Sequence, residues 1–401
     1  MAQTLATFEK ALKENYLPVW RNQLGIEPSA LLSKIKKVPL KSDKIVATAP
    51  VGLSGGFGFG AEGLATPVAG GVPFERFETR AKDMYVNVCI SAKAVRLTGS
   101  GGAMANALDA EVKGAYETAK WNVGRSLFGN GTGILTTASS ITTKGTHNGK
   151  DAYTFTVASV QYLKEGLIID AVSPTGYGHL CTVRIVGIDR VAKKVIAVLI
   201  SGDISGIASG TPLAVQNSAG REITGLGAIF DDTVTSIYGV KKADNPFLKP
   251  IVADGADIDD GLITKALRAA KNEKNSNVDM LLCGDDAFDD YITYLRTNNV
   301  RVEDMSHTIN GGFKAIKFIF GNTVVDVVND SFVPANEMWG VDTSCLELHT
   351  QEWNFADLQG GGIFNLMENQ SIYRALLANY GDLICTNPGG CVRIHGVSFT
   401  K

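Results

Sequence analysis

The stretch that decides the fold begins with MYVNVCISAKAVRL (residues 84–97), passes through Gly-Ser-Gly-Gly (99–102) and ends with the run from Ala103 to Phe128. The first part is typical of a β-strand. The run from Ala103 to Phe128 lacks proline and is rich in Ala, Leu, Glu and Lys, which predicts a helix. About 26 helical residues span about 39 Å, which is long for a globular protein and suits the bracing of an extended subunit.

Upstream, residues 45–80 are crowded with glycine and proline, which predicts a long extended hairpin or loop. A solvated linker seldom carries many aromatic rings, because exposed apolar surface invites association. We therefore expect the four phenylalanines of this segment to contact a partner surface. They are Phe57, Phe59, Phe74 and Phe77.

The N-terminus shows apolar residues at steps of three or four, which predicts an amphipathic helix. We expect Pro18, Pro28 and Pro39 to break the segment that follows. The helix either packs on its own domain or reaches across the surface of a neighbour. The residues of the apolar stripe include Leu5, Phe8, Leu12, Tyr16 and Trp20.

Short β-type runs set off by Gly, Asp and Pro fill the stretch from Leu135 to Gly225, which predicts an inserted all-β domain, a small barrel or sandwich. Mixed α/β character then resumes. Asp259 and Asp260 are expected to cap a helix that runs to about Lys274, and a second helix is predicted from Asp285 to Asn298. FKAIKFIF-GN-TVVDVV predicts a hairpin that turns at Gly321-Asn322. Further strands are predicted around 338–341, 345–349, 372–378 and 392–394.

Composition excludes several classes of protein. The net charge of −3 lacks the strongly basic character of a phosphate-binding protein. The longest apolar run, Val195 to Ile200, is too short for a membrane span, and the charged N-terminus lacks the apolar core of a secretory signal, so we expect a cytosolic chain. The six cysteines include no C-x-x-C pair, which favours free buried thiols.

No catalytic, cofactor or metal site is predicted. Gly58, Gly60 and Gly63 match G-x-G-x-x-G, but the prolines and glycines that follow forbid the helix that a dinucleotide site needs. The acidic stretch from Asp254 to Asp260 lacks calcium-loop spacing, and the five histidines form no metal pair. G-x-S-x-G is absent. An enzymatic function remains open, since the residues of a catalytic triad can come from distant positions in the sequence.

The order of these features resembles the major capsid proteins of tailed bacteriophages, which share the Hong Kong 97-type fold with encapsulins. DMYVNVCISAKAVRL and the helix ending WNVGRSLFGNGTGIL are similar to the family's strand, spine helix and Gly-rich exit. FKAIKFIFGNTVVDVVNDSFVPANEMWGVDTSCLEL and FNLMENQSIYRALLANYGDLICTNPGGCVRIHGV are similar to its hairpin and closing strands.

The resemblance implies an α+β Hong Kong 97-type capsid fold with an inserted all-β domain. Its implied divisions are an N-terminal arm (1–44), an E-loop (45–83), a P-domain with the spine helix (84–135), the inserted β domain (136–225), a return segment (226–256), most of the A-domain (257–345), and C-terminal P-domain and A-domain strands (346–401). In that family the A-domain lies at the centre of pentamers and hexamers, while the arm and E-loop lie across neighbours.

The resemblance also implies a non-enzymatic subunit of the virion capsid, assembled in the host cytoplasm around double-stranded DNA without sequence-specific contact. Implied partners are other copies of the chain, a separate scaffolding protein, a portal protein and a cement or decoration protein. No membrane contact and no cofactor is implied. Some relatives cross-link an E-loop lysine to a neighbour's asparagine, but residues 47–81 contain no lysine, so a non-covalent shell is expected. Two alternative functions are the shell protein of an encapsulin-type compartment and, less favoured, a soluble enzyme with an unrecognised site.

Overall fold

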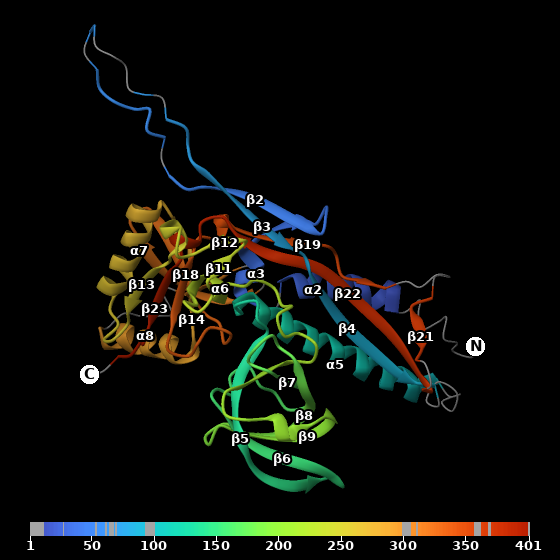
Figure 1. Ribbon diagram of the computed structural model, residues 1–401. Helices are drawn as coiled ribbons and strands as arrows, with labels where there is room; N and C mark the ends of the chain where they lie inside the picture. Colours follow the sequence, from blue (N-terminus) through green and yellow to red (C-terminus); the bar gives the residue numbers. More distant parts are fainter. Residues whose placement is uncertain are drawn as a thin grey trace. The chain divides into compact units, whose positions relative to one another are not determined.

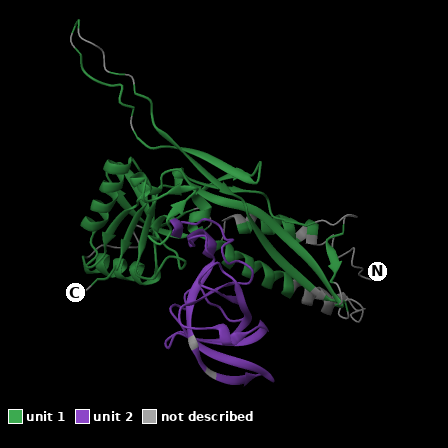
Figure 2. Ribbon diagram, viewed as in Figure 1, with its two compact units in different colours: residues 1–124, 229–401 green, residues 125–228 purple. Residues whose placement is uncertain are grey.

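The computed structural model describes the chain except residues 1–11, 27, 53, 61, 64–67, 69, 93–100, 299–305, 310–311, 357–361, 368–369 and 400–401. The chain divides into two compact units, of which unit 1 comprises residues 1–124 and 229–401 and unit 2 comprises residues 125–228 (Figure 2). Among the described residues, no helix combines the length and the apolar character that crossing a membrane requires.

The first sheet of unit 1 is built on the long strand β22 (Ile372–Cys385), which pairs along its length with β4 (Lys82–Ser91) (Figure 1). Its other strands are β1 (Lys36–Pro39), β19 (Leu346–Thr350), β20 (Asn354–Phe355) and β21 (Phe364–Leu366). The helix α5 (Gly101–Phe128), assigned to unit 1 up to Gly124, packs on this sheet through Val112 and Tyr116. The predicted strand and long helix are confirmed. Residues 93–100 lie outside the described part.

The N-terminal segment packs on the same core. A π-helical turn (η1, Leu12–Tyr16) leads into α2 (Leu17–Ile26), whose Trp20 and Leu24 are buried in the cluster around α5. The predicted break at Pro18 is wrong. Pro18 is the second residue of α2, and the chain stays helical through it, from η1 into α2. The next helix, α3 (Ala30–Lys34), is capped by the Ser29 hydroxyl, which accepts from Leu31 N at 3.1 Å.

The second sheet of unit 1 is mixed and is covered on one face by α7 (Asp260–Lys274) and α8 (Asp285–Thr297). Both predicted helices are thereby confirmed, as is the cap by Asp259, and the predicted hairpin turns at Gly321 with φ of +58°. In spatial order the strands are β13 (Ile251–Asp254), β23 (Val392–His395), β18 (Met338–Val341), β14 (Met280–Cys283), β17 (Thr323–Asn329), β16 (Lys314–Phe320) and β15 (Ser306–Thr308).

Two short pairings complete unit 1. The strands β2 (Lys44–Pro50) and β3 (Phe74–Arg80) form one hairpin, and β11 (Ser236–Ile237) and β12 (Val240–Lys241) form another. Further helical turns among the described residues are η3 (Pro246–Leu248), η5 (Thr343–Cys345), η6 (Pro388–Gly390) and α6 (Gly227–Phe230), which begins in unit 2 and ends in unit 1.

Unit 2 contains a closed antiparallel barrel in the order β10-β5-β6-β9-β8-β7. Its interior is filled by alternate strand residues such as Phe155, Ile169, Ile185 and Leu213, all with no exposed surface. The short β runs of the sequence fall on these strands. They are β5 (Ile134–His147), β6 (Lys150–Val157), β7 (Ile168–Val172), β8 (His179–Asp189), β9 (Lys194–Gly202) and β10 (Thr211–Val215), with a turn η2 (Ile204–Gly206).

The two ends of unit 2 are joined to each other. Leu226 N donates to Leu127 O at 2.8 Å, and the guanidinium of Arg125 donates to both carboxylate oxygens of Glu222, at 2.9 and 2.5 Å. The side chains of this ion pair are only 5% and 9% exposed. A buried bidentate pair is costly to break, because the remaining charge stays in a poorly solvated site.

We predict that Arg125→Met lowers the free energy of unfolding by about 3–5 kcal/mol, since it leaves the Glu222 carboxylate buried without its cation. Urea titration followed by circular dichroism measures the change. Lys144→Met breaks an ion pair with Asp151 in the same unit whose side chains are 60% and 53% exposed, and serves as the matched control. A comparable loss in both variants would contradict the burial argument, because exposed pairs contribute about 0–1 kcal/mol.

Candidate assembly surfaces

The described residues between β2 and β3 form two chain stretches that run side by side and extend away from the sheets of unit 1 (Figure 1). Val51 N donates to Pro73 O at 2.8 Å, and the Ser54 hydroxyl donates to Gly70 O at 2.5 Å. A Cβ on Gly70 would lie 2.8 Å from the backbone of Gly55, so glycine permits the two stretches to approach this closely. We call residues 51–73 the hairpin tip and β2 with β3 the hairpin root.

The hairpin tip presents aromatic side chains to solvent. Phe57 is 82% exposed and Phe59 is 97% exposed. Their rings contact each other edge to face with centroids 5.4 Å apart. Phe74, at the first position of β3, is also largely exposed. Exposed apolar rings held together in one place mark an interaction surface more strongly than isolated ones.

The hairpin root, by contrast, is fixed to the core through Phe77. This ring has no exposed surface and packs between Tyr238, with centroids 5.5 Å apart, and Phe247, stacked at 6.3 Å. Tyr238 and Gly239 form the turn between β11 and β12, and both have positive φ, as a tight hairpin turn of this kind requires.

Polar contacts fix the root further. Glu78 N donates to Tyr238 O at 2.9 Å, and the Thr79 hydroxyl donates to the fully buried carboxylate of Asp382 at 2.5 Å. The hydroxyl of Tyr238 in turn accepts from Cys385 N at 3.0 Å, and burial raises the pKa of Tyr238 well above its ordinary value. The hairpin root is therefore held to the core of unit 1 by both packing and hydrogen bonds.

Two side chains predicted to be buried by a neighbour are already buried within the chain. Phe77 fills the root, and Trp20, 4% exposed, packs on Tyr116 with ring centroids 5.9 Å apart. Both side chains therefore have packing partners within the chain, and their predicted contact with a neighbouring subunit stays a prediction. For Phe77 a signal was present: Phe74 and Phe77 are three positions apart on one strand, so they must point to opposite faces.

The other stripe residues of the predicted arm are placed only in part. Leu5 and Phe8 lie outside the described residues, as does the side chain of Leu12. Tyr16 is half-buried and packs against the cluster around α5. Sequence reasoning missed Tyr238, and the only local turn signal was the glycine that follows it, Gly239.

Residues 29–34 are attached to the second sheet at both ends. The Ser29 hydroxyl donates to Asp330 at 2.6 Å, and Lys34 Nζ lies 2.5 Å from Asp326. Burial raises the pKa of Asp330 to about 6, while hydrogen bonds from Ser29 and from Phe332 N favour its charged form. These two contacts attach residues 29–34 to the strand β17 and to the residue that follows it, Asp330.

No group of three or more His, Cys, Asp or Glu side chains within the described ranges is arranged to hold a metal ion. Four of the six cysteines are buried, Cys345 is half-buried and Cys89 is exposed. Burial raises the pKa of Cys181 to about 11, with smaller contributions from Asp170 and Asp203. Such a thiol is a poor nucleophile, because the thiolate is the reactive form.

No protein-family model and no curated protein sequence matches the chain. Among solved structures, a chain of the cyanophage A-1(L) capsid asymmetric unit superposes with a TM-score of 0.53 at 11% identity, covering 92% of each chain. The SrpI encapsulin of Synechococcus elongatus gives 0.46 at 9% identity, covering 93% of this chain and 88% of that one. The procapsid of satellite phage P4, which includes a size determination protein, gives 0.45 at 10% identity, covering 99% and 98%.

The superposition on the cyanophage chain shows that the chain has the fold of a phage capsid protein. This fold is the one expected from the resemblance in the sequence. It spans nearly the whole length of both chains.

We predict opposite outcomes for two phenylalanines. Phe77→Ala should lower the free energy of unfolding by about 3–5 kcal/mol, because it empties a fully buried site. Phe57→Ala should change it by less than about 0.5 kcal/mol, since the ring is exposed. Urea unfolding of the unassembled chain measures both, and equal effects would contradict the division between root and tip.

We also predict that Asp330 makes stability fall as pH rises. Because its pKa is about 6 in the folded chain against 3.8 ordinarily, the folded state holds a proton between these values that the unfolded state has lost. Relative to the Asp330→Asn variant, the natural chain should lose about 3 kcal/mol of stability between pH 3 and pH 7. Asp244→Asn, at an exposed aspartate, controls for the loss of one carboxylate. A pH-independent difference between the natural chain and Asp330→Asn would refute the assignment.

Proposed function

We propose that the chain is a structural subunit, not an enzyme, and that its copies assemble as pentamers and hexamers into an icosahedral phage head around double-stranded DNA. The observation that carries the proposal is a hairpin with a rigid, buried root and an exposed aromatic tip. The capsid-protein fold supports it.

The geometry suits attachment to another copy. An isolated chain leaves the rings of Phe57 and Phe59 in water, and burying each ring on a neighbour would contribute about 1.5–3 kcal/mol. A root fixed by Phe77 and Thr79 limits the directions that the tip must search, which reduces the entropic cost of docking. Each copy in a closed shell both extends and receives a tip, so modest contacts add up over the whole shell.

The proposal includes a non-covalent shell. Residues 47–81 hold no lysine, and the flanking Lys44 is engaged by Glu78 in an ion pair. It further includes a separate scaffolding protein, a portal protein and a cement protein as partners, with DNA enclosed without base-specific contacts. Under this proposal the chain is a virion component that is assembled in the host cytoplasm. Its proposed divisions are the arm (1–44), the E-loop (45–83), the P-domain with the spine helix (84–135), the inserted β domain (136–225), a return segment (226–256), most of the A-domain (257–345), and C-terminal P-domain and A-domain strands (346–401).

We predict that Phe57→Ser/Phe59→Ser prevents particle formation while leaving the subunit folded, because it removes the apolar area that docking would bury. Negative-stain microscopy of the expressed chain, with and without a co-expressed scaffold, measures assembly, and circular dichroism measures folding. Val191→Ser removes a side chain that is 97% exposed in unit 2 and serves as the matched control.

Natural particles should release single chains on a denaturing gel. Covalent ladders would contradict the non-covalent shell. A small oligomer of fixed size under all conditions would contradict the shell itself, and particles that hold a protein cargo in place of DNA would favour the encapsulin alternative.

A further inference from the structure

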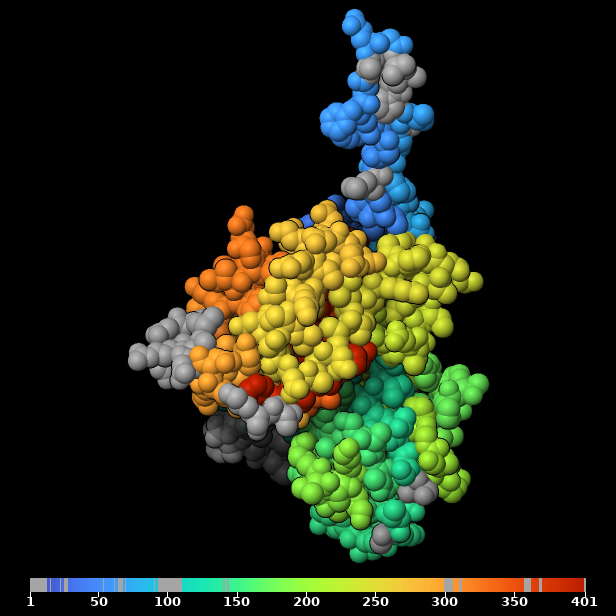
Figure 3. Space-filling view, turned by 90° about the vertical axis from the view of Figure 1, so that its left-hand side faces the viewer, coloured from blue at the N-terminus to red at the C-terminus, as the bar shows by residue number. Residues whose placement is uncertain are grey.

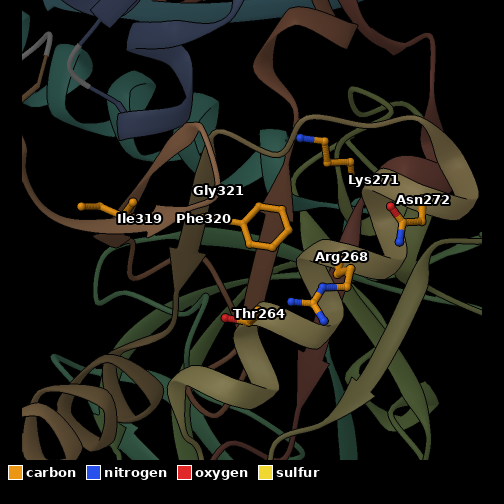
Figure 4. A pocket seen from close by; sticks show the side chains of 7 residues that line it. All are labelled: Thr264, Arg268, Lys271, Asn272, Ile319, Phe320 and Gly321. Atoms are coloured by element: carbon orange, nitrogen blue, oxygen red, sulfur yellow. The ribbon is translucent and has the colours of Figure 1, made fainter.

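A pocket of unit 1 lies between α7 and the turn of the β16–β17 hairpin, where Phe320 lines it together with Arg268 and Lys271 (Figure 4). Each polar side chain that lines it is exposed or half-buried, so the pocket lacks the fixed polar groups of a ligand site. On the face shown in Figure 3, the C-terminal residues, in red, are visible only between residues coloured yellow and orange. This enclosed C-terminal part of the chain holds a cluster of thiols.

Three of the six cysteines lie where the chain passes from the first sheet of unit 1 to the second. Cys385 is the last residue of β22, and Cys391 directly precedes β23 (Figure 1). Cys345 lies beside the same strand end, because its carbonyl oxygen accepts from Thr386 N at 2.8 Å. Cys385 and Cys391 are 1% and 2% exposed, whereas Cys345 is half-buried.

The turn between the two buried thiols is held tightly. Its helical part, η6, is capped by Asn387, whose side-chain oxygen accepts from Gly390 N at 3.1 Å. The side-chain amide of Asn387 donates to Lys274 O, at the end of α7, at 3.0 Å. A Cβ on Gly389 would lie 1.9 Å from Phe247 O, so only glycine allows the turn to pack this closely. The two ends of the turn are therefore fixed relative to each other.

Both sulfur atoms meet at the backbone of Asn387. The thiol of Cys391 donates to Asn387 O, with the two atoms 4.0 Å apart, and the N–H of Asn387 donates to the sulfur of Cys385. The two thiols are also hydrogen-bonded to each other, and this bond, followed by burial, raises the pKa of Cys385 well above its ordinary value. The fold has thus already brought together the two sulfur atoms that a disulfide would join.

We propose that Cys385 and Cys391 are an oxidative modification site, at which the folded chain forms an intrachain disulfide when it meets a small disulfide such as oxidised glutathione. The inference goes beyond the proposed function and does not depend on it. One cysteine thiolate attacks the oxidant and displaces one thiol, and the second thiolate then displaces the other. The new S–S bond replaces that of the oxidant, which takes up two electrons and the two thiol protons and leaves as two thiols.

Burial makes this reaction slow and confines it to an oxidising environment. The thiolate is the attacking form, and a raised pKa keeps it scarce. Thr386 and Asn387 are half-buried, so the turn reaches the surface, and local opening there admits an oxidant. Inside a cell, glutathione and thioredoxin keep thiols reduced. Under the proposed function, particles released from the cell leave that environment, and the pair is oxidised afterwards.

The disulfide would join the end of β22 to the start of β23, and so link the two sheets of unit 1 by a second covalent path. Such a bond stabilises a fold mainly by restricting the unfolded chain. Because residues 385–391 form a short loop, the expected rise in the unfolding temperature is modest, about 2–4 °C.

The test counts the thiols of the full-length chain. The chain is reduced, freed of reductant and incubated with oxidised glutathione, and the remaining thiols are alkylated in denaturant and counted by mass spectrometry. We expect the six thiols of the reduced chain to fall to four. Trypsin should release residues 375–393, which contain both cysteines and no internal Lys or Arg, as a peptide that is not alkylated and is lighter by two hydrogen atoms. Thermal unfolding measures the gain in stability.

Cys391→Ala should keep its five thiols after the same incubation and gain no thermal stability. Cys181→Ala removes a buried thiol of unit 2 instead and is the matched control, which should still lose two thiols. A further sample of the natural chain is refolded from urea in the same glutathione buffer, so that slow access to the thiols is not mistaken for an unreactive pair.

Six free thiols after both routes would overturn the inference. A disulfide of Cys385 or Cys391 with Cys345, or a lasting mixed disulfide with glutathione, would overturn it as well. A crosslink found only in the refolded sample would also count against it, because the inference concerns the folded chain. None of these results bears on whether the chain assembles into particles, which microscopy decides separately.

Discussion

The burial of one ring, Phe77, is the constraint on which the hairpin depends. The ring is held between Tyr238 and Phe247, so a strand near the N-terminus is fixed by segments some 160 residues further along the chain. Tyr238 can reach this position only because its turn places two consecutive residues at positive φ, a strain that Gly239 reduces. The hydrogen bond from Cys385 N to the Tyr238 hydroxyl extends the same support to β22.

Elements with strong local signals were predictable from the sequence. The helix from Gly101 to Phe128, the Asp259 cap and the Gly321 turn follow from residues that are neighbours along the chain. Phe57 and Phe59 stand out because glycines surround them and no local pattern offers them a core. A spacing of two in an extended chain also puts both rings on one side, where they pack together.

What the sequence could not supply depends on contacts between distant segments. Pro18 is expected to break a helix, yet the chain stays helical from η1 into α2, where Trp20 and Leu24 are buried in the core. No sequence pattern near Phe77 indicates that its ring packs against Tyr238.

The hydrogen bond between Leu226 N and Leu127 O has a consequence for chain length. The two ends of unit 2 are held together by this hydrogen bond and by the ion pair between Arg125 and Glu222. The entropy lost in bringing the ends of a loop together grows only with the logarithm of its length, and a folded insert with adjacent ends removes most of that loss. An insert of a different length that kept these ends adjacent would therefore add little loop-closure entropy, so this junction could accommodate another small domain.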